Sequence, residues 1–325
     1  MSLVCIRLLH WKEPARVRSA FKLDKRKQLT LLKRLGQPPT EALLVSTCGR
    51  LEVYLHSLNV EHAVEHARTE LHEWEGAGFS FDVLKESQAL EHLICVASSL
   101  DSVVLGEQQI FGQIKAAFEL GREAGTVRDE FKLVQETVLQ GATRVYAQLG
   151  SGWGERSMAS VAVEMISRAV GGLKDRRVLV VGTGDMGERL GQRLKQEGAG
   201  QLLFINHTPK RAWELAKKVG GTPRLFEELP NVLKDVSMVL CATSSPEPFL
   251  TQENVRAVLE SRRGEPLHLV DLSVPLNIAP DVADLKGVHV YCVDHIQQFV
   301  SEHHPQWSEE ARKGRALVRQ EVSLR

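Results

Sequence analysis

The chain has 325 residues, 43% of them hydrophobic, and its 41 basic and 41 acidic side chains give no formal net charge. This length and composition predict a globular protein of about two domains. The charge balance excludes steering of the whole molecule towards nucleic acid or an anionic membrane. No apolar run is long enough to span a bilayer, and the N-terminus lacks the basic region of a signal peptide, so we expect a cytoplasmic protein.

Charge and cysteine positions narrow the expectation further. Nine basic and two acidic residues lie between Trp11 and Leu35, a local balance of +7. This stretch is either a solvated helix face or a local patch for an RNA partner. The five cysteines are odd in number, widely spaced and without a CxxC pair, which argues against a disulfide framework or a structural zinc site. We expect free thiols and no metal centre.

Strands and helices alternate in the first half. Apolar runs at 4–9, 42–46 and 50–56 predict strands, the last because leucine and valine alternate with polar neighbours. A basic, leucine-rich stretch at 26–35 predicts a helix. From about residue 82 to 149 apolar residues recur at helical spacing, so this region should be mostly helical. A mixed α/β domain is therefore expected over residues 1–150.

The second half has a different pattern, which begins after a glycine-rich break at 150–154 and a small-residue helix at 157–170. A β-branched run at 177–181, a helical stretch and an apolar run at 201–205 form a βαβ unit. Further buried strands are expected at 236–242, 267–272 and 288–293. The spacing predicts a Rossmann-like, doubly wound domain over residues 151–295, with a parallel sheet and helices on both faces.

The last segment, residues 296–325, is charged and helical. It predicts the beginning of one long connecting helix, and its tail from Ser308 shows no clear apolar stripe.

A GxGxxG motif directly follows the strand predicted at 177–181 and opens a helix. In this context the first glycine permits a tight turn, the second lets the backbone approach a pyrophosphate, and the third lets helix pack on strand. The alternative is a glycine-rich turn without a ligand. The candidate cofactor-binding residues are Gly182, Thr183, Gly184, Asp185, Met186 and Gly187.

The strand at 201–205 ends without the acidic residue that normally accepts hydrogen bonds from the ribose of NAD. Positive charge beyond that strand suits the 2′-phosphate of NADP(H), although the same cations also suit a solvated helix start. The residues concerned are Asn206, His207, Thr208, Lys210 and Arg211.

Cys48 differs from the other cysteines because it lies between two predicted strands, in the sequence Ser-Thr-Cys-Gly-Arg at 46–50. A neighbouring guanidinium favours thiolate, and it would equally serve to anchor a substrate carboxylate. The other four cysteines, which lie within apolar patterns and are predicted to be small buried hydrophobic residues, are Cys5, Cys95, Cys241 and Cys292.

Several of these motifs resemble those of the glutamyl-tRNA reductase family, over nearly the whole chain. The residues Thr-Cys-Gly-Arg at 47–50 are similar to the family's TCNR, and LDSVVLGEQQI at 100–110 matches its LDSxxxGExQI segment. The GxGxxG motif, Asn-His-Thr at 206–208 and Asp-Leu-Ser-Val-Pro at 271–275 correspond as well. A generic NADP dehydrogenase would share only the second half.

The resemblance implies NADPH-dependent reduction of glutamyl-tRNA to glutamate-1-semialdehyde, the first step of tetrapyrrole (5-aminolevulinate) biosynthesis. In that family a cysteine attacks the ester that joins glutamate to tRNA, and hydride from NADPH reduces the thioester. Cys48 would be the nucleophile, and His92 a second catalytic residue through proton transfer or positioning. By its sequence context alone, His92 favours a capping or core position over a catalytic role.

The resemblance also implies a substrate site and a product partner. The aldehyde would pass to the semialdehyde aminomutase, and Arg50 would be the natural partner of the glutamyl carboxylate. The residues expected to hold the glutamyl group are Thr47, Gly49, Arg50, Ser102, Glu107, Gln108, Gln109 and Gln113.

The chain departs from the family pattern at several positions. Gly49 stands where the family usually has Asn, and His207 where Arg is common. Relatives continue after the connecting helix into a dimerisation domain, whereas this sequence ends at Arg325, so we expect a monomeric or weakly associated chain. Two other hypotheses stay open: a catalytically weak relative with a nucleotide-binding or regulatory role, and an NADP dehydrogenase of a small molecule, which would leave the thiol loop unexplained.

Overall fold

The computed structural model describes residues 2–9, 23–47, 49–75, 81–107, 109–150, 152–262 and 264–323, with only the backbone for residues 8, 9 and 73–75. The chain forms two compact units, Met1–Ser157 with His304–Arg325, and Met158–His303. No helix in the described ranges is long and apolar enough to cross a membrane. The mixed α/β fold class predicted from the sequence is confirmed.

A four-stranded antiparallel sheet with the order β2-β3-β1-β4 forms the centre of the first unit. Side chains alternate between its faces, so Leu51, Val53 and Leu55 join one hydrophobic cluster while Tyr54 joins the other. This alternation also sends Glu52 to the face of Tyr54. The strands are β1 (Ser2–Leu9), β2 (Glu41–Ser46), β3 (Arg50–Ser57) and β4 (Asp82–Lys85).

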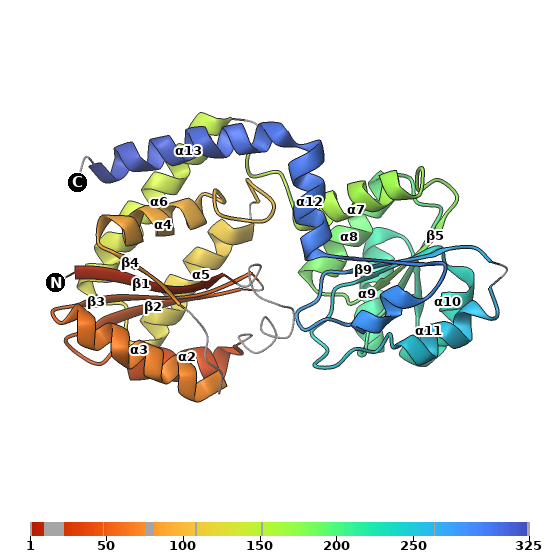
Figure 1. Cartoon of the computed structure of the whole chain (residues 1–325), viewed down its shortest axis with the longest axis horizontal. Helices are drawn as coiled ribbons and strands as arrows, with labels where there is room; N and C mark the ends of the chain where they lie inside the picture. Colours follow the sequence, from red (N-terminus) through yellow and green to blue (C-terminus); the bar gives the residue numbers. More distant parts are fainter. Residues whose placement is uncertain are drawn as a thin grey trace. The chain divides into compact units, whose positions relative to one another are not determined.

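Helices cover both faces of this sheet (Figure 1). One face packs on α2 (Lys25–Leu35) and α3 (Val60–Glu75), and the other on α4 (Ser87–Ala97), α5 (Gln109–Ala124) and α6 (Asp129–Leu149). The Glu41 carboxylate, at the start of β2, accepts hydrogen bonds from the backbone N–H groups of Arg128 and Phe131 at 2.7 and 3.1 Å. It thereby satisfies free donors at the N-terminus of α6 and fixes that helix against the sheet.

A six-stranded parallel sheet with the order β10-β9-β8-β5-β6-β7 forms the second unit, as predicted for a Rossmann-like domain. The order reverses between β5 and β8, which is where such sheets bind dinucleotides. The strands are β5 (Arg177–Val181), β6 (Gln201–Ile205), β7 (Thr222–Arg224), β8 (Met238–Cys241), β9 (Leu267–Asp271) and β10 (Val288–Cys292).

Helices lie on both faces of the parallel sheet (Figure 1). Helices α10 (Leu229–Asp235) and α11 (Gln252–Leu259) bury apolar residues against one face. Helix α8 packs on the other face, where Gly191 lies against Phe204 of β6. The remaining helices are α7 (Met158–Ala169), α9 (Pro209–Val219), α12 (Val293–His303) and two 3₁₀ turns, η2 (Phe226–Glu228) and η3 (Pro280–Asp284), with α8 spanning Asp185–Gln196.

The C-terminal helix differs in two respects from the expectation. A long helix is present, but it begins at Pro305 as α13 (Pro305–Ser323), separately from α12, which ends at His303. The expectation of no apolar stripe was wrong, because α13 buries Trp307, Ala311, Gly314 and Val318 at helical spacing. Two of these four are Gly and Ala, whose small side chains weaken the stripe in the sequence while permitting close packing.

Two further predictions are corrected at the level of single segments. Asp82–Lys85, expected in a helical region, forms the edge strand β4, paired with β1. In the basic stretch, residues 11–22 lie outside the described residues. The remainder forms α2, where the exposed cations Lys25 and Arg34 pair with Glu123 and Glu70, each at 2.8 Å.

Candidate active site

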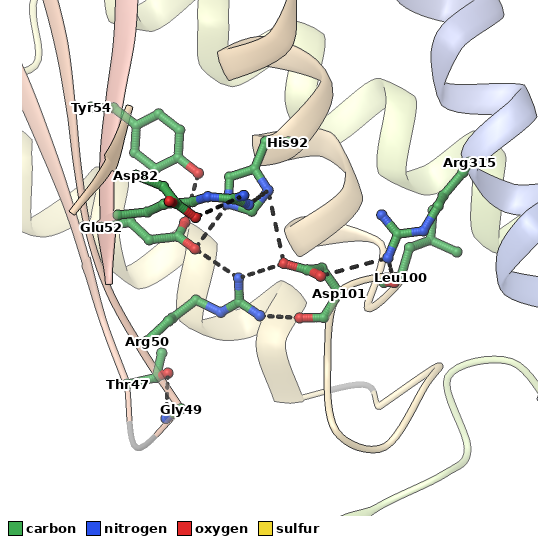
Figure 2. Close-up of polar contacts among 11 residues, drawn as sticks. Thr47, Gly49, Arg50, Glu52, Tyr54, Asp82, His92, Leu100, Asp101 and Arg315 are labelled. Carbon is green, nitrogen blue, oxygen red and sulfur yellow. Dashed lines mark hydrogen bonds and ion pairs between the residues drawn. The ribbon is translucent and has the colours of Figure 1, made fainter. Parts of the chain in front are cut away.

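The turn between β2 and β3 carries the predicted nucleophile, Cys48, which itself lies outside the described residues. The turn closes through a hydrogen bond from the Thr47 N–H to the Arg50 carbonyl at 2.9 Å. The Thr47 hydroxyl accepts the Gly49 N–H at 3.2 Å. The pairing of β2 with β3 therefore fixes both ends of the turn that joins these two strands (Figure 2).

Arg50, the first residue of β3, is buried, with only 2% of its surface exposed. Its Nη1 donates to Glu52 Oε1 at 2.8 Å and to Asp101 Oδ2 at 3.4 Å, and its Nη2 donates to the Asp101 carbonyl. Burial alone would lower the pKa of Arg50, but the two carboxylates outweigh it and raise that pKa. The guanidinium, predicted to meet a substrate carboxylate, thus has protein carboxylates as its partners here.

Glu52 is the centre of the buried network (Figure 2). Its carboxylate accepts hydrogen bonds from Arg50, from the Tyr54 hydroxyl at 2.7 Å and from His92 Nε2 at 2.9 Å. Burial alone would raise the pKa of Glu52, but the attraction of His92 and Arg50 and these hydrogen bonds hold it well below its usual range. Glu52 is therefore a carboxylate that accepts hydrogen bonds and does not donate a proton.

His92, on α4, has a tautomer assigned by its neighbours. Arg7 Nη1 lies 3.3 Å from His92 Nδ1, and because a guanidinium only donates, Nδ1 must accept. The ring proton is then on Nε2 and points to Glu52. Asp101 Oδ2 lies 3.8 Å from Nδ1, so a protonated ring would face a carboxylate on each side. Nδ1 therefore lies between the guanidinium of Arg7 and the carboxylate of Asp101.

Ser102 and Gln113, two other predicted substrate-binding residues, have no described interaction with this network. Ser102 is half-buried beside Asp101, and Gln113 is exposed on α5. The backbone of Glu107 forms an isolated parallel β-bridge with that of Arg156, and Gln109 is the first residue of α5. Gln108 lies outside the described residues. The segment from Leu100 to Gln113 therefore brings Asp101, rather than the predicted side chains, into contact with Arg50 and His92.

One buried group of described residues, Cys5, Glu52 and His92, has the spacing of metal ligands, with its ligand atoms within 4.8 Å of one another. The chemistry fits a metal poorly. The Glu52 carboxylate already accepts three hydrogen bonds, and Arg50 places a cation beside it. Burial raises the pKa of the Cys5 thiol well above its ordinary value, so the thiolate that a metal requires is disfavoured.

Four cysteines were predicted to be small buried hydrophobic residues. Three of them, Cys5, Cys95 and Cys241, are buried. Burial raises the pKa of Cys5 and Cys241 well above the ordinary value and that of Cys95 to about 12. Cys292 differs from the prediction, since it is half-buried at the end of β10 with its sulfur 3.3 Å from His295 Nδ1. Cys292 is therefore the control residue for any experiment that identifies Cys48 as the nucleophile.

The glycine-rich loop after β5 has the geometry of a dinucleotide site. A Cβ at Gly182, whose φ is +102°, would meet the Ala242 carbonyl oxygen at 2.2 Å, and a Cβ at Gly187 would meet the Gly182 carbonyl oxygen at 1.9 Å. No heavy atom lies within 4 Å of a Cβ built at Gly184. Among the described residues the buried Thr183 hydroxyl has no hydrogen-bond partner. The loop thus leaves space and a free polar atom where a pyrophosphate would lie.

The end of β6 has no acidic residue, as the sequence indicated. Asn206 donates to the Thr208 carbonyl at 3.3 Å, and α9 begins at Pro209. His207 stacks on Phe226, with ring centroids 4.3 Å apart. Lys210 is exposed and lies 4.0 Å from Glu214. These residues fit an NAD(P) cofactor, with positive charge beside the ribose position.

Comparisons with known proteins agree with both halves of this description. Residues 6–149 match the family described as glutamyl-tRNA(Glu) reductase, N-terminal domain, and residues 164–299 match the family described as shikimate / quinate 5-dehydrogenase. A glutamyl-tRNA reductase of Myxococcus xanthus is 45% identical over 99% of this chain and 74% of that protein. The chain belongs to the glutamyl-tRNA reductase family.

Other members of the family are similar along the same length. A glutamyl-tRNA reductase of Akkermansia muciniphila is 34% identical over 99% of the chain and 97% of that protein. The solved glutamyl-tRNA reductase of Methanopyrus kandleri aligns with 99% of the chain and 79% of its own, at 28% identity and a TM-score of 0.49. Family membership and the dehydrogenase-like fold make the chain an oxidoreductase of the NAD(P)-binding class.

Four residues of the buried network were not predicted from the sequence: Arg7, Glu52, Tyr54 and Asp101. The signal for Glu52 was present, since Arg50, Glu52 and Tyr54 alternate with the apolar residues of β3 and must share a face. Asp101 lies inside the segment that carries the family resemblance. Arg7 had no local signal, because its role depends on the pairing of β1 with β3.

Proposed function

We propose that the chain catalyses NADPH-dependent reduction of glutamyl-tRNA to glutamate-1-semialdehyde through a thioester on Cys48, the first step of tetrapyrrole biosynthesis. The observation that best supports this proposal is the buried contact between His92 and Glu52, behind the turn that carries the thiol. Residues 1–150 would recognise the glutamyl group, and residues 151–295 would bind the cofactor.

In the first step the Cys48 thiolate attacks the ester carbonyl of the substrate. A carbon–sulfur bond forms, the bond to the ribose oxygen breaks, and that oxygen takes up a proton. His92 is suited to move this proton through Nδ1 when Arg7 gives up its hydrogen bond to that nitrogen, because Glu52 holds Nε2–H and Asp101 faces Nδ1. Glu52 and Asp101 also stabilise the positive charge that the ring acquires while it holds the proton.

The second step is the reduction of the thioester. A dinucleotide, when bound, would supply the hydride; the carbon–sulfur bond would then break and release the Cys48 thiolate and the aldehyde. Gly182 and Gly187 would hold the loop close to the pyrophosphate, and Thr183 would offer it a hydroxyl. We propose NADPH as the cofactor because Lys210 and Arg211 place positive charge beyond β6 and no acid ends that strand.

The glutamyl carboxylate requires a cation in the site. Arg50 stays the proposed partner, since it lies directly after the turn, and a substrate carboxylate would approach its Nη2 while Nη1 keeps its contacts with Glu52 and Asp101. Thr47 and Gly49 would contribute the hydroxyl and the unhindered backbone of the turn. The product is a reactive aldehyde, and we propose its transfer to the aminomutase that the family resemblance implies.

Trapping of the intermediate tests this proposal. Incubation with glutamyl-tRNA labelled in the glutamate, without NADPH, should leave label on the protein in a hydroxylamine-sensitive linkage. Cys48→Ser should carry no such label and form no semialdehyde, while it binds NADPH normally, because a hydroxyl is a far poorer nucleophile at neutral pH. Cys292→Ser, which removes the half-buried thiol beside His295, is the matched control and should label like the wild type. Label on Cys292, or reduction by Cys48→Ser near the wild-type rate, would refute the assignment.

The alternative of a catalytically weak, nucleotide-binding relative makes a different prediction in the same experiment. Such a protein would bind NADPH but acquire no label at Cys48. The third hypothesis, a small-molecule NADP dehydrogenase, is disfavoured by the match of residues 6–149 to a reductase-specific N-terminal domain.

A further inference from the structure

The C-terminal helix α13 packs directly on the segment that carries Asp101. At Gly314 a Cβ would come within 2.5 Å of Leu100 Cδ2, so the helix backbone lies against that leucine. Ala311 and Val318 join the same hydrophobic cluster as Leu100 and Leu93 of α4. The position of α13 is therefore fixed within the first unit by contacts beside the candidate active site.

Arg315 extends this contact into the polar network (Figure 2). Its Nη2 donates to the Leu100 carbonyl at 2.6 Å and lies 3.6 Å from Asp101 Oδ1. The other carboxylate oxygen of Asp101, Oδ2, faces Arg50 at 3.4 Å and His92 at 3.8 Å. The Asp101 carboxylate thus has one cation on each oxygen, and one of the two comes from the C-terminal helix.

We propose that Arg315 is a positioning residue for the reduction, which acts through Asp101 to hold a carboxylate oxygen towards His92 Nδ1. The inference rests on the proposed function. A carboxylate can rotate about its terminal bond, and two cations on opposite oxygens restrict that rotation. The side chain of Asp101 is 20% exposed and that of Arg315 is 41% exposed, so water competes for both. The second cation therefore matters for orientation more than for stability.

Arg319 on the same helix provides the matched comparison. Its Nε donates to Glu91 at 3.2 Å, and its side chain is 70% exposed. It is the same residue type, one turn further along α13, and it also pairs with a carboxylate on the first unit. Glu91 has no contact with Arg50 or His92 among the described interactions, so the pair does not reach the catalytic network.

The experiment compares Arg315→Gln, Arg315→Lys and Arg319→Gln in the full chain. Glutamine removes the charge that faces Asp101 and is too short to keep the hydrogen bond to the Leu100 carbonyl, whereas lysine keeps the charge. We expect Arg315→Gln to lower the rate of thioester formation on Cys48 roughly tenfold, in line with coupling energies of contacting residues. The KM for glutamyl-tRNA and the midpoint of thermal unfolding should match those of Arg319→Gln. Arg315→Lys should recover most of the rate.

A double-mutant cycle provides the second measurement. In an Asp101→Asn background, Arg315→Gln should cause no further loss, because the residue through which it acts is already altered. Equal rates for Arg315→Gln and Arg319→Gln, or an undiminished loss in the Asp101→Asn background, would overturn the proposal. A change confined to the KM for tRNA and sensitive to salt would also overturn it, because it would identify Arg315 as a phosphate contact. If the wild-type chain forms no thioester at all, the proposed function fails together with this inference.

Discussion

Glu52 is the common partner of two other buried polar side chains, Arg50 and His92. Glu52 is fully buried and Arg50 is 2% exposed, and each compensates the charge of the other. Removal of one partner of a buried ion pair leaves the other uncompensated, which is more costly than loss of a surface pair. The same carboxylate orients His92 through Nε2. Stability and catalysis should therefore both respond to this single side chain.

We predict that Glu52→Gln lowers the rate of thioester formation about 100-fold and destabilises the fold by about 3 kcal/mol. Glutamine fills the same volume but leaves Arg50 buried without its closest countercharge and weakens the acceptor for His92. Single-turnover labelling of Cys48 measures the rate, and urea denaturation measures the stability. Glu123→Gln, which removes the exposed partner of Lys25, serves as the control and should change neither by much. A wild-type labelling rate in Glu52→Gln would contradict the assigned role.

How well each of these residues could be predicted depends on how far away its interaction partners lie in the sequence. Cys48 and the glycines of the nucleotide loop have signals within six residues of sequence, and both were identified as candidates. Glu52 becomes a catalytic candidate only through His92, 40 residues away, and Asp101 only through Arg50, 51 residues away. A local pattern does not indicate whether a carboxylate will find such partners, because the tertiary fold decides that.

The three glycines of the loop after β5 lack a side chain for different reasons. Gly182 and Gly187 are required by the protein itself, because a Cβ at either position would clash with backbone. Gly184 has φ −76° and open space around it, so an alanine would be tolerated in the absence of a ligand. The approach of a pyrophosphate would account for its lack of a side chain, in addition to the preference for glycine at a helix N-cap.

This difference predicts opposite behaviour for two substitutions. Gly184→Ala should unfold at the wild-type temperature but bind NADPH at least roughly tenfold more weakly, because its methyl group occupies the ligand's approach. Gly187→Ala should lose about 1–3 kcal/mol of stability, because helix α8 must move away from the loop. Calorimetric unfolding and titration of NADPH fluorescence separate the two effects. Unchanged NADPH affinity in Gly184→Ala would exclude the loop as the pyrophosphate site.

The element after β6 leads to a prediction about cofactor choice. We expect the chain to bind NADPH more tightly than NADH, because the cations beyond β6 suit a 2′-phosphate. The double change Lys210→Ala and Arg211→Ala should narrow this preference, by roughly tenfold, with little effect on NADH. Lys217→Ala with Lys218→Ala, at the far end of α9, removes equal charge and is the control. Equal affinities of the unmodified chain for the two cofactors would exclude NADPH selectivity.

The apolar strands of both sheets were located from the sequence, whereas α3 and β7 were not predicted, and β4 and the apolar stripe of α13 were predicted wrongly. β4 contains only four residues and is recognisable by its pairing with β1. The apolar stripe of α13 consists partly of Ala311 and Gly314, which carry little hydrophobic signal but allow the helix to approach Leu100. In both cases the partner element, and not the segment itself, supplies the information.

The molecule as a whole contains buried titratable groups that respond to acid in different pH ranges. In the first unit the pKa of Glu52 is held well below its usual range, so its contribution to stability is complete above about pH 4.3 and is lost only as the pH falls further. In the second unit His268, on β9, is 7% exposed and stacks on His289 at 4.8 Å. Burial, then His289 and Arg176, lower the pKa of His268 to about 4.

Acidification should therefore weaken the second unit first. Because the folded state disfavours protonated His268, the unfolded chain takes up the proton more readily, and stability falls as the pH drops from about 6.5 to about 4, by up to about 1.4 kcal/mol per pH unit. His268→Gln, which cannot titrate, should flatten the pH dependence of unfolding in this window while leaving the decline below pH 4. The exposed His62 on α3 provides the control, since His62→Gln should leave the profile unchanged. Thermal unfolding between pH 4 and 8 measures the effect, and an identical pH dependence in His268→Gln and the wild type would show that another group controls the acid transition.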